Sequence, residues 1–226
     1  LETVDHYLWK FHSKGGASKS MEYSAYLNNK LVGYYAAIPL SYKFLDKSLK
    51  VALVCDVMTG VNARGKGVFT KLGFYSTKEI ENEGFDFTTG YPIRPEVLPG
   101  HLKVGWEVNL DLPLYVCFVS FKSLFEKIKI GFLSRVFDKI NSILYRFNFL
   151  FHSKNSDIQI CLHSSNDVEI LKKISFFYLE WQKEVPIALT KDFDFLSWRL
   201  GAPNKEYTII TLNHNNNIVG VLISTA

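Results

Sequence analysis

The chain has 226 residues, of which 47% are hydrophobic and 15% aromatic, and its formal net charge is +4. This is enough apolar material for one large domain, or for one domain and part of another, and it excludes bulk disorder. The mild positive charge permits an anionic ligand. It falls short of the dense basic surface that nucleic-acid-binding proteins usually carry, so we expect no nucleic acid partner.

The cysteines and histidines give no sign of a metal site. Cys55, Cys117 and Cys161 are far apart and odd in number, and the six histidines show no metal-ligand spacing. We therefore expect no metal and a reducing, cytoplasmic location. The sequence holds no run of about 18 uncharged apolar residues that could span a bilayer.

The first half of the chain predicts an alternation of strands and helices. Residues 1–12 have the apolar spacing of a helix, residues 24–44 predict two strands around an Asn28-Asn29 turn, and residues 51–61 predict a buried strand. A glycine-rich loop then leads into a helix over 68–84. Further along we expect a short strand within 85–92, a short helix within 94–105 and a strand over 106–119.

Residues 120–151 differ from the rest in their charge pattern. They contain a helical stripe of apolar side chains with basic residues outside it: Leu133, Val136, Phe137, Ile140, Leu144 and Phe147. We expect a linker helix that packs on a domain. The alternative is a helix that lies on a membrane surface, which the excess of lysine and arginine favours.

A new unit begins at Asp157. A strand is predicted over 157–163, a helix over 166–184, a second helix over 192–200 and a hairpin over 207–225. Ser165 or Asn166 is the expected cap of the first of these helices, with Glu169 near the capping-box position.

Two parts of the chain resemble each other. In both, a tryptophan and a basic residue end an aromatic-rich helix, and an asparagine-rich turn and a Val-Gly pair follow. The matches are Trp9 with Trp198, Lys10 with Arg199, and Val32-Gly33 with Val219-Gly220. Such an echo predicts an internal duplication, with coincidence between two ordinary helix–hairpin units as the alternative.

The segment from Gly60 to Leu72, GVNARGKGVFTKL, raises the question of which anion it binds. A nucleotide-binding P-loop needs a serine or threonine after its lysine, and here Gly67 stands there. The other interpretation is a glycine-rich turn whose backbone N–H groups, at the start of a helix, hold a diphosphate. A turn with solvated basic residues and no ligand is the remaining alternative.

At these residues the chain resembles the GNAT superfamily of coenzyme A-dependent acyltransferases. The family's loop motif, (Arg/Gln)-x-x-Gly-x-(Gly/Ala), appears as Arg64–Phe69, with Phe69 where a small residue is usual, and HLKVGWEV resembles a second family segment. The resemblance implies an α/β fold with a mixed, mostly antiparallel central sheet flanked by helices. It covers residues 1–118, without the first strand; residues 119–156 are then a helical linker, and 157–226 resemble the opening of a second GNAT module. We expect the chain to be a fragment of a tandem protein.

The resemblance also implies a site for acetyl-coenzyme A, the co-substrate. Backbone amides of the loop would hold the pyrophosphate: Arg64, Gly65, Lys66, Gly67, Val68 and Phe69. Backbone groups of Val57, Met58 and Thr59 would pair with the pantetheine arm, which enters where the strand within 85–92 separates from this one. The acyl group, most simply acetyl, then passes to an amine of a small molecule or sugar precursor.

The acid and base are less firmly implied. His101 stands where the family often has a tyrosine near the leaving thiolate, and it is either a proton donor or a packed histidine. Asp56 is either the base or a structural hydrogen-bonding group. Glu96 and Tyr91 are weaker candidates.

Two rivals remain. One is an aminoacyltransferase of the same fold, against which the RGKG loop argues. The other is a non-catalytic module that binds coenzyme A or another protein, favoured by the departures at Phe69 and His101. Weak membrane contact through 120–151 is compatible with the enzyme reading, and the sequence assigns no oligomeric state.

Overall fold

The computed structural model describes residues 3–12, 20–92, 94–110, 135–144 and 157–225 of the chain. It divides into two compact units, Leu1–Glu107 with Gln159–Ala226, and Val108–Ile158. The domain boundaries expected from the sequence stay a prediction.

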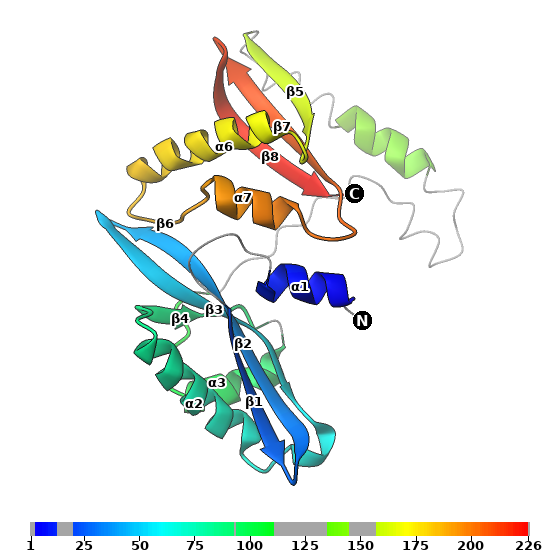
Figure 1. The fold of residues 1–226 in the computed structure, drawn as a ribbon. Helices are drawn as coiled ribbons and strands as arrows, with labels where there is room; N and C mark the ends of the chain where they lie inside the picture. The colour runs from blue at the N-terminus through cyan, green and yellow to red at the C-terminus, as the bar shows by residue number, and fades with distance from the viewer. Residues whose placement is uncertain (1–2, 13–19, 93, 111–134, 145–156, 226) are drawn as a thin grey trace. The chain divides into compact units, whose positions relative to one another are not determined.

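The larger unit contains a mixed sheet (Figure 1). Its strands β1 (Met21–Leu27), β2 (Lys30–Phe44), β3 (Lys47–Thr59) and β4 (Phe87–Thr89) lie in chain order. β2 is antiparallel to both β1 and β3, and β4 is parallel to β3. A short strand, β6 (Ile187–Leu189), adds antiparallel to the far end of β2. The expected fold class, a mostly antiparallel sheet with flanking helices, is confirmed.

Each face of this sheet carries its own apolar cluster. One cluster includes Tyr35, Ala52, Leu72 and Ile80, and the two last belong to α2 (Val68–Asn82). On the other face, Phe11 of α1 (Val4–His12) packs with sheet residues that include Ala36 and Ile38. Three short helical segments complete this part of the chain: η1 (Val61–Ala63), η2 (Pro95–Val97) and α3 (Leu98–Lys103).

Residues 157–225 form a second, three-stranded sheet with two helices. The strands β5 (Ile158–Ser164), β7 (Tyr207–His214) and β8 (Asn217–Thr225) lie in the order β5-β7-β8. The helices are α6 (Val168–Trp181), followed by η3 (Gln182–Glu184), and α7 (Phe193–Leu200). Side chains of α6 and α7 bury Ile209 of β7 in a common core.

The expected cap of α6 is wrong by one or two residues. The cap is Asp167, whose carboxylate accepts hydrogen bonds from the backbone N–H groups of Glu169 and Ile170. The backbone N–H of Asn166 instead donates to Ser164 Oγ. With Asp167 as the cap, Glu169 lies one position too early to close a capping box.

The two hairpins share their irregularities as well as their sequence pattern. Each turns on two asparagines with positive φ, Asn28 and Asn29 in one and Asn215 and Asn216 in the other. In β1–β2 the register skips Val32, and in β7–β8 it skips Val219 at the same place relative to the turn. A bulge at the same place in both hairpins is what the sequence echo predicts. Whether the halves arose by duplication stays a prediction.

The smaller unit is described for one helix, residues 135–144. Its apolar side chains, Val136, Phe137, Ile140, Ile143 and Leu144, are 42–60% exposed. The predicted stripe residues Leu133 and Phe147 lie outside the described residues. The strand expected over 106–119 is absent from 106–110, and its remainder also lies outside them. Within the described ranges no helix is long and apolar enough to cross a membrane.

Candidate functional site

The glycine-rich loop joins the end of β3 to the start of α2. Gly65 and Gly67 have φ of 73° and 74°, in the left-handed region that side-chain-bearing residues seldom adopt. A Cβ on either would meet nothing within 4 Å, so the glycines are needed for the backbone turn and the space beside them is open. The two basic residues of the loop, Arg64 and Lys66, are exposed.

The helix that follows begins without a side-chain cap. Its N-cap is Gly67, which has no side chain to offer. The backbone N–H groups of Val68, Phe69 and Thr70 belong to the first turn, which has no intrahelical acceptors. These donors, the positive end of the helix dipole and two nearby cationic side chains are the features that bind a phosphate group. The N–H groups of Arg64 and Lys66 already donate to the carbonyls of Val61 and Ala63, at 3.3 and 3.4 Å.

Upstream of the loop, β3 carries a bulge. Ala36 pairs with Cys55 and Tyr34 pairs with Met58, so one residue of β2, Tyr35, faces both Asp56 and Val57. Asp56 takes φ of 49°, which breaks the strand's alternation. The bulge therefore directs Asp56 toward α1 while Val57 packs against the cluster on the α2 face.

The other edge of β3 pairs with β4 for three residues only. That ladder ends at Leu53 and Thr89, whereas β3 continues to Thr59. A Cβ at Gly90 would lie 3.0 Å from the ring of Trp106, which packs where β4 has ended. Thr59 Oγ1 and Trp106 Nε1 are buried with no hydrogen-bond partner among the described residues. Beyond Leu53 this edge of β3 has no strand partner among the described residues, so a ligand could pair with its backbone there.

His101, on α3, is 7% exposed and packs between two aromatic rings. Its ring centroid is 5.1 Å from that of Phe69, in an edge-to-face arrangement, and 4.7 Å from that of Trp106. Its Nδ1 has no hydrogen-bond partner among the residues that the structure describes. Burial lowers the pKa of His101, so the imidazole is neutral at pH values near 7. A neutral imidazole can donate one N–H to a leaving sulfur, but it is not a ready source of a proton.

The large residue in the loop motif, Phe69, has a local explanation. A Cβ on Gly100 of α3 would lie 2.6 Å from the Phe69 ring. The ring therefore occupies the space that a side chain at position 100 would need. The pair Phe69–Gly100 joins the first turn of α2 to α3, and the same contact places His101 beside the loop.

Asp56 is held by an ion pair. Its Oδ2 lies 2.6 Å from Nζ of Lys10, which reaches it from α1. Its side chain remains 30% exposed. Among the described residues no hydrogen bond joins Asp56 to His101, so the structure brings His101 to the loop and Asp56 to α1.

The weaker candidates lie apart from these contacts. Tyr91 is exposed, and so is Glu96, which belongs to η2. In the part of the chain that the structure describes, neither forms a hydrogen bond or ion pair with His101, Asp56 or the loop. Their assignment rests on the sequence alone.

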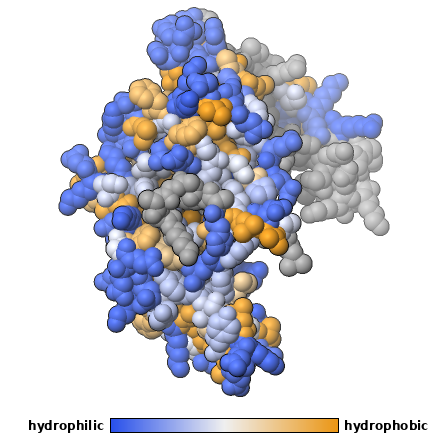
Figure 2. Space-filling view, in the orientation of Figure 1, coloured by the Kyte–Doolittle hydropathy of each residue, from blue (hydrophilic) through white to orange (hydrophobic). Residues whose placement is uncertain are grey.

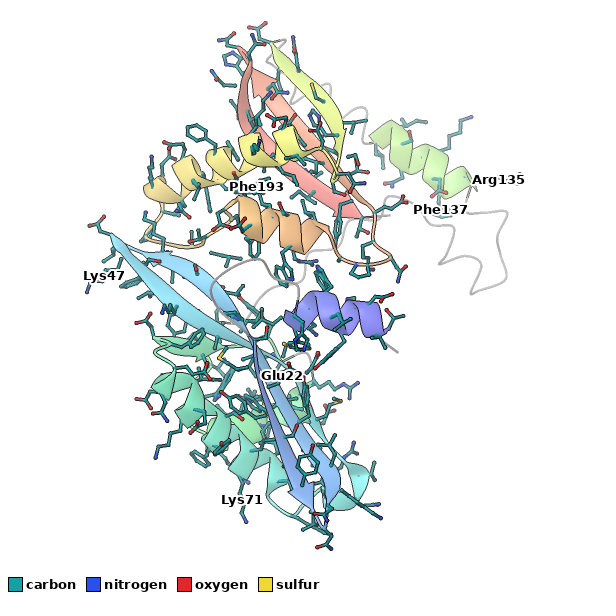
Figure 3. The ribbon with its side chains drawn as sticks, viewed as in Figure 1. Glu22, Lys47, Lys71, Arg135, Phe137 and Phe193 are labelled. Carbon is teal, nitrogen blue, oxygen red and sulfur yellow. The ribbon has the colours of Figure 1, made fainter. Side chains whose placement is uncertain are left out.

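A cluster that the sequence did not reveal surrounds Glu22, which Figure 3 labels on β1 near α1. Glu22 of β1 accepts hydrogen bonds at Oε2 from the hydroxyls of Tyr7 and Tyr34, both at 2.6 Å. His12 Nε2 lies 3.3 Å from Glu22 Oε1. Glu22 precedes the strands predicted over 24–44, and an acidic residue at such a position is commonly a solvated side chain.

Comparisons with known proteins bear on this geometry. Residues 4–108 match the family model for the acetyltransferase (GNAT) domain. No curated protein is similar enough to match the chain. Among solved structures, a conserved protein of unknown function from Enterococcus faecalis V583, titled a probable N-acyltransferase, aligns with 99% of this chain at a TM-score of 0.54 and 10% identity. This chain spans 48% of that protein's length.

Two further structures match over a shorter region. Glucosamine-6-phosphate N-acetyltransferase from Arabidopsis thaliana is 19% identical over 40% of this chain and 59% of its own, with a TM-score of 0.34. A predicted acetyltransferase from Clostridium acetobutylicum, in a structure with acetyl-CoA, is 17% identical over 43% of this chain and 64% of its own, with a TM-score of 0.38.

Residues 4–108, a little under half of the chain, are similar to the acetyltransferase (GNAT) domain. The mixed sheet and the glycine-rich loop before α2 agree with that similarity.

Proposed function

We propose that residues 4–108 transfer an acyl group, most simply acetyl, from a coenzyme A thioester to an amine. The observation that carries this proposal is the open loop Arg64–Gly67 before the uncapped start of α2. In this proposal Gly65, Gly67, Val68 and Phe69 offer backbone N–H groups to the pyrophosphate, and the side chains of Arg64 and Lys66 supply positive charge.

The pantetheine arm is proposed to follow β3 beyond the end of its ladder with β4. Val57, Met58 and Thr59 form the strand edge there, and the unpaired Thr59 Oγ1 is a polar atom that such a ligand could satisfy. Coenzyme A supplies the activated acyl group as its thioester. The protein positions the acceptor and polarises the carbonyl, and these two effects account for most of the rate in such direct transfers.

In this mechanism the acceptor amine attacks the thioester carbonyl, the carbon–sulfur bond breaks with the sulfur leaving as the coenzyme A thiolate, and the amine gives up its proton to Asp56. Asp56 is the carboxylate closest along β3 to the proposed thioester position, and its pairing with Lys10 keeps it in place. His101 is proposed to donate a hydrogen bond to the leaving sulfur as a neutral imidazole. A non-catalytic coenzyme A-binding module is the second candidate, because the ion pair at Asp56 also suits a purely structural role.

Calorimetric titration of acetyl-coenzyme A into the protein, beside Gly67→Glu and Gly84→Glu, tests the proposal. Both glycines have positive φ and open space around the missing Cβ, at φ of 74° and 80°, but they lie at opposite ends of α2. The two variants therefore share backbone strain and added charge. We expect Gly67→Glu to abolish saturable binding and Gly84→Glu to retain it.

Absence of saturable binding in the wild-type protein would overturn the proposal, and so would equal losses in both variants. Binding without turnover across an amine panel would favour the non-catalytic candidate.

A further inference from the structure

The cluster of Tyr7, His12, Glu22 and Tyr34 is not explained by the fold. Its counterparts in the second half of the chain show this directly. Counting from the asparagine turns, Glu22 and Tyr34 occupy the hairpin positions of Ile209 and Val221; counting from the tryptophans, Tyr7 corresponds to Leu196. Those three apolar residues pack in the core of the second sheet.

The same helix-on-hairpin arrangement is thus filled with apolar side chains in one half and with a hydrogen-bonded polar group in the other. Tyr7 is 38% exposed and the Glu22 side chain 19%, so the cluster is partly open to solvent. Replacing both partners of such hydrogen bonds by apolar groups of the same shape is often nearly neutral for stability. The sheet does not require Glu22 in order to pack on a helix, because the second half packs without it. The polar group in the first half therefore needs an explanation other than packing.

The geometry of the carboxylate indicates what it binds. Oε2 already accepts two short hydrogen bonds, from Tyr7 and Tyr34. Among the described residues, the neighbour of Oε1 is His12 Nε2 at 3.3 Å, beyond the usual range for such a bond. Oε1 is therefore the atom that can accept a strong, charge-assisted hydrogen bond from a ligand.

The charges around Glu22 favour a cation. Lys10 is paired with Asp56 at 2.6 Å, so these two charges offset one another. No lysine or arginine in the described part of the chain forms an ion pair with Glu22, whose side chain is 19% exposed and so within reach of a small molecule. The hydrogen bond to Glu22 raises the pKa of Tyr7, and burial together with that bond raises the pKa of Tyr34, so both phenols stay protonated and continue to donate.

The cluster also adjoins the strand of the proposed thioester site. Tyr34 pairs with Met58 of β3, and the Asp56 carboxylate is close enough to contribute to the raised pKa of Tyr34. A ligand held at Glu22 would therefore lie on the α1 face of the sheet, near the bulge at Asp56.

We propose that the Glu22 carboxylate, held by Tyr7 and Tyr34, binds a non-reacting ammonium group of the acceptor, so that the acceptor carries two amines. This inference rests on the proposed function, because it places the second amine relative to the acyl transfer site. The reacting amine is the other one, which must be uncharged to attack the thioester.

Isothermal titration of putrescine and cadaverine, with and without coenzyme A, tests the site. The isosteric monoamines n-pentylamine and n-hexylamine are the matched ligands, since each replaces one ammonium by a methyl group. The proteins are wild type, Glu22→Gln, Tyr34→Phe and the control Glu81→Gln, which alters an exposed carboxylate on α2. Acetyl transfer to the same amines is measured in parallel.

We expect the wild-type protein and Glu81→Gln to bind at least one diamine about ten- to a hundredfold more tightly than its monoamine. Glu22→Gln should lose this preference while retaining coenzyme A binding, and Tyr34→Phe should weaken it. Equal binding of diamines and monoamines by wild type, or an unchanged preference in Glu22→Gln, would overturn the inference. If coenzyme A fails to bind, the proposed function fails, and the diamine titration without coenzyme A still decides whether Glu22 is a cation site.

Discussion

Trp9 and Trp198 form a reciprocal pair of hydrogen bonds, in which the indole N–H of each donates to the backbone carbonyl of the other. The indole N–H of Trp9 donates to the backbone carbonyl of Trp198 over 2.6 Å, and the indole N–H of Trp198 donates to that of Trp9 over 2.9 Å. The rings stack, with centroids 5.2 Å apart and planes at 12°. Corresponding residues of the two similar segments thus contact each other as the two sides of a two-fold interface do.

The reciprocal bonds predict strong coupling between the two tryptophans. Each single change to phenylalanine, Trp9→Phe or Trp198→Phe, should lower the free energy of unfolding by about 1–2 kcal/mol, because it leaves a carbonyl without its donor. The double variant should lose less than the sum of the two, by about 0.5–3 kcal/mol. Urea unfolding of the four proteins measures this, with Trp181→Phe as a control at the exposed end of α6. Additive losses would contradict a shared interaction.

The polar side chains of the cluster at Glu22 can be replaced by the apolar residues that occupy the corresponding positions in the second half of the chain. We expect Glu22→Ile combined with Tyr7→Leu and Tyr34→Val, which copies the second half of the chain, to unfold at a free energy within about 1 kcal/mol of wild type, because both partners of each hydrogen bond are replaced by apolar groups. Glu22→Ala alone should be destabilising by about 1–3 kcal/mol, since both phenols lose their acceptor. Chemical denaturation of the two variants tests this. A triple variant less stable than Glu22→Ala would show that the cluster is needed for folding.

The contact between Phe69 and Gly100 predicts a compensating pair. Gly100→Ala alone should be destabilising by about 1–3 kcal/mol, because its methyl group would overlap the phenyl ring. Adding Phe69→Leu should recover part of the loss, since the smaller side chain can move away. Thermal unfolding of the single and double variants measures the recovery. If the double variant loses as much as both singles together, the two positions act independently.

His101 predicts a pH dependence of stability. Its pKa is lowered by burial, so the unfolded chain binds this proton more readily than the folded one does. The stabilising contribution is fully present above the unfolded value, about 6.5, and is lost as the pH falls below it toward the lowered folded pKa.

Unfolding measured from about pH 7 down to about pH 5 should therefore show a smaller loss of stability in His101→Gln than in wild type. Equal slopes in the two proteins would indicate that the imidazole titrates alike in the folded and unfolded chain.

Local patterns predicted the parts of the fold that local chemistry controls. The Asn28-Asn29 and Asn215-Asn216 turns, the loop at Arg64–Gly67 and the helix after it follow from residues within a few positions of one another. The cap of α6 was misplaced because serine, asparagine and aspartate all cap helices, and their order does not say which one has the extended backbone that a cap needs.

The long-range parts could not be predicted in this way. The strand at Ile187–Leu189 is three residues long and exists because β2 offers it an edge. The partners of Asp56 and Glu22 come from α1, across a sequence gap that no periodicity bridges. The candidate site therefore has two parts. The loop could be predicted from its glycines, whereas the cluster around Glu22 forms only when a helix packs on the sheet.

The joining of β6 to β2 makes the two halves of the larger unit hard to separate. β1 covers one edge of β2 as far as Ala37, and β6 covers Tyr42–Phe44. Lys43 Nζ donates to the carbonyls of Gln182 and Val185, at 2.5 and 2.9 Å, near the end of α6. A chain shortened to the GNAT domain alone would expose unpaired strand backbone and a lysine without these carbonyls. Such an edge can pair with the same edge of another molecule, so the shortened chain should be prone to precipitate at concentrations that the longer chain tolerates.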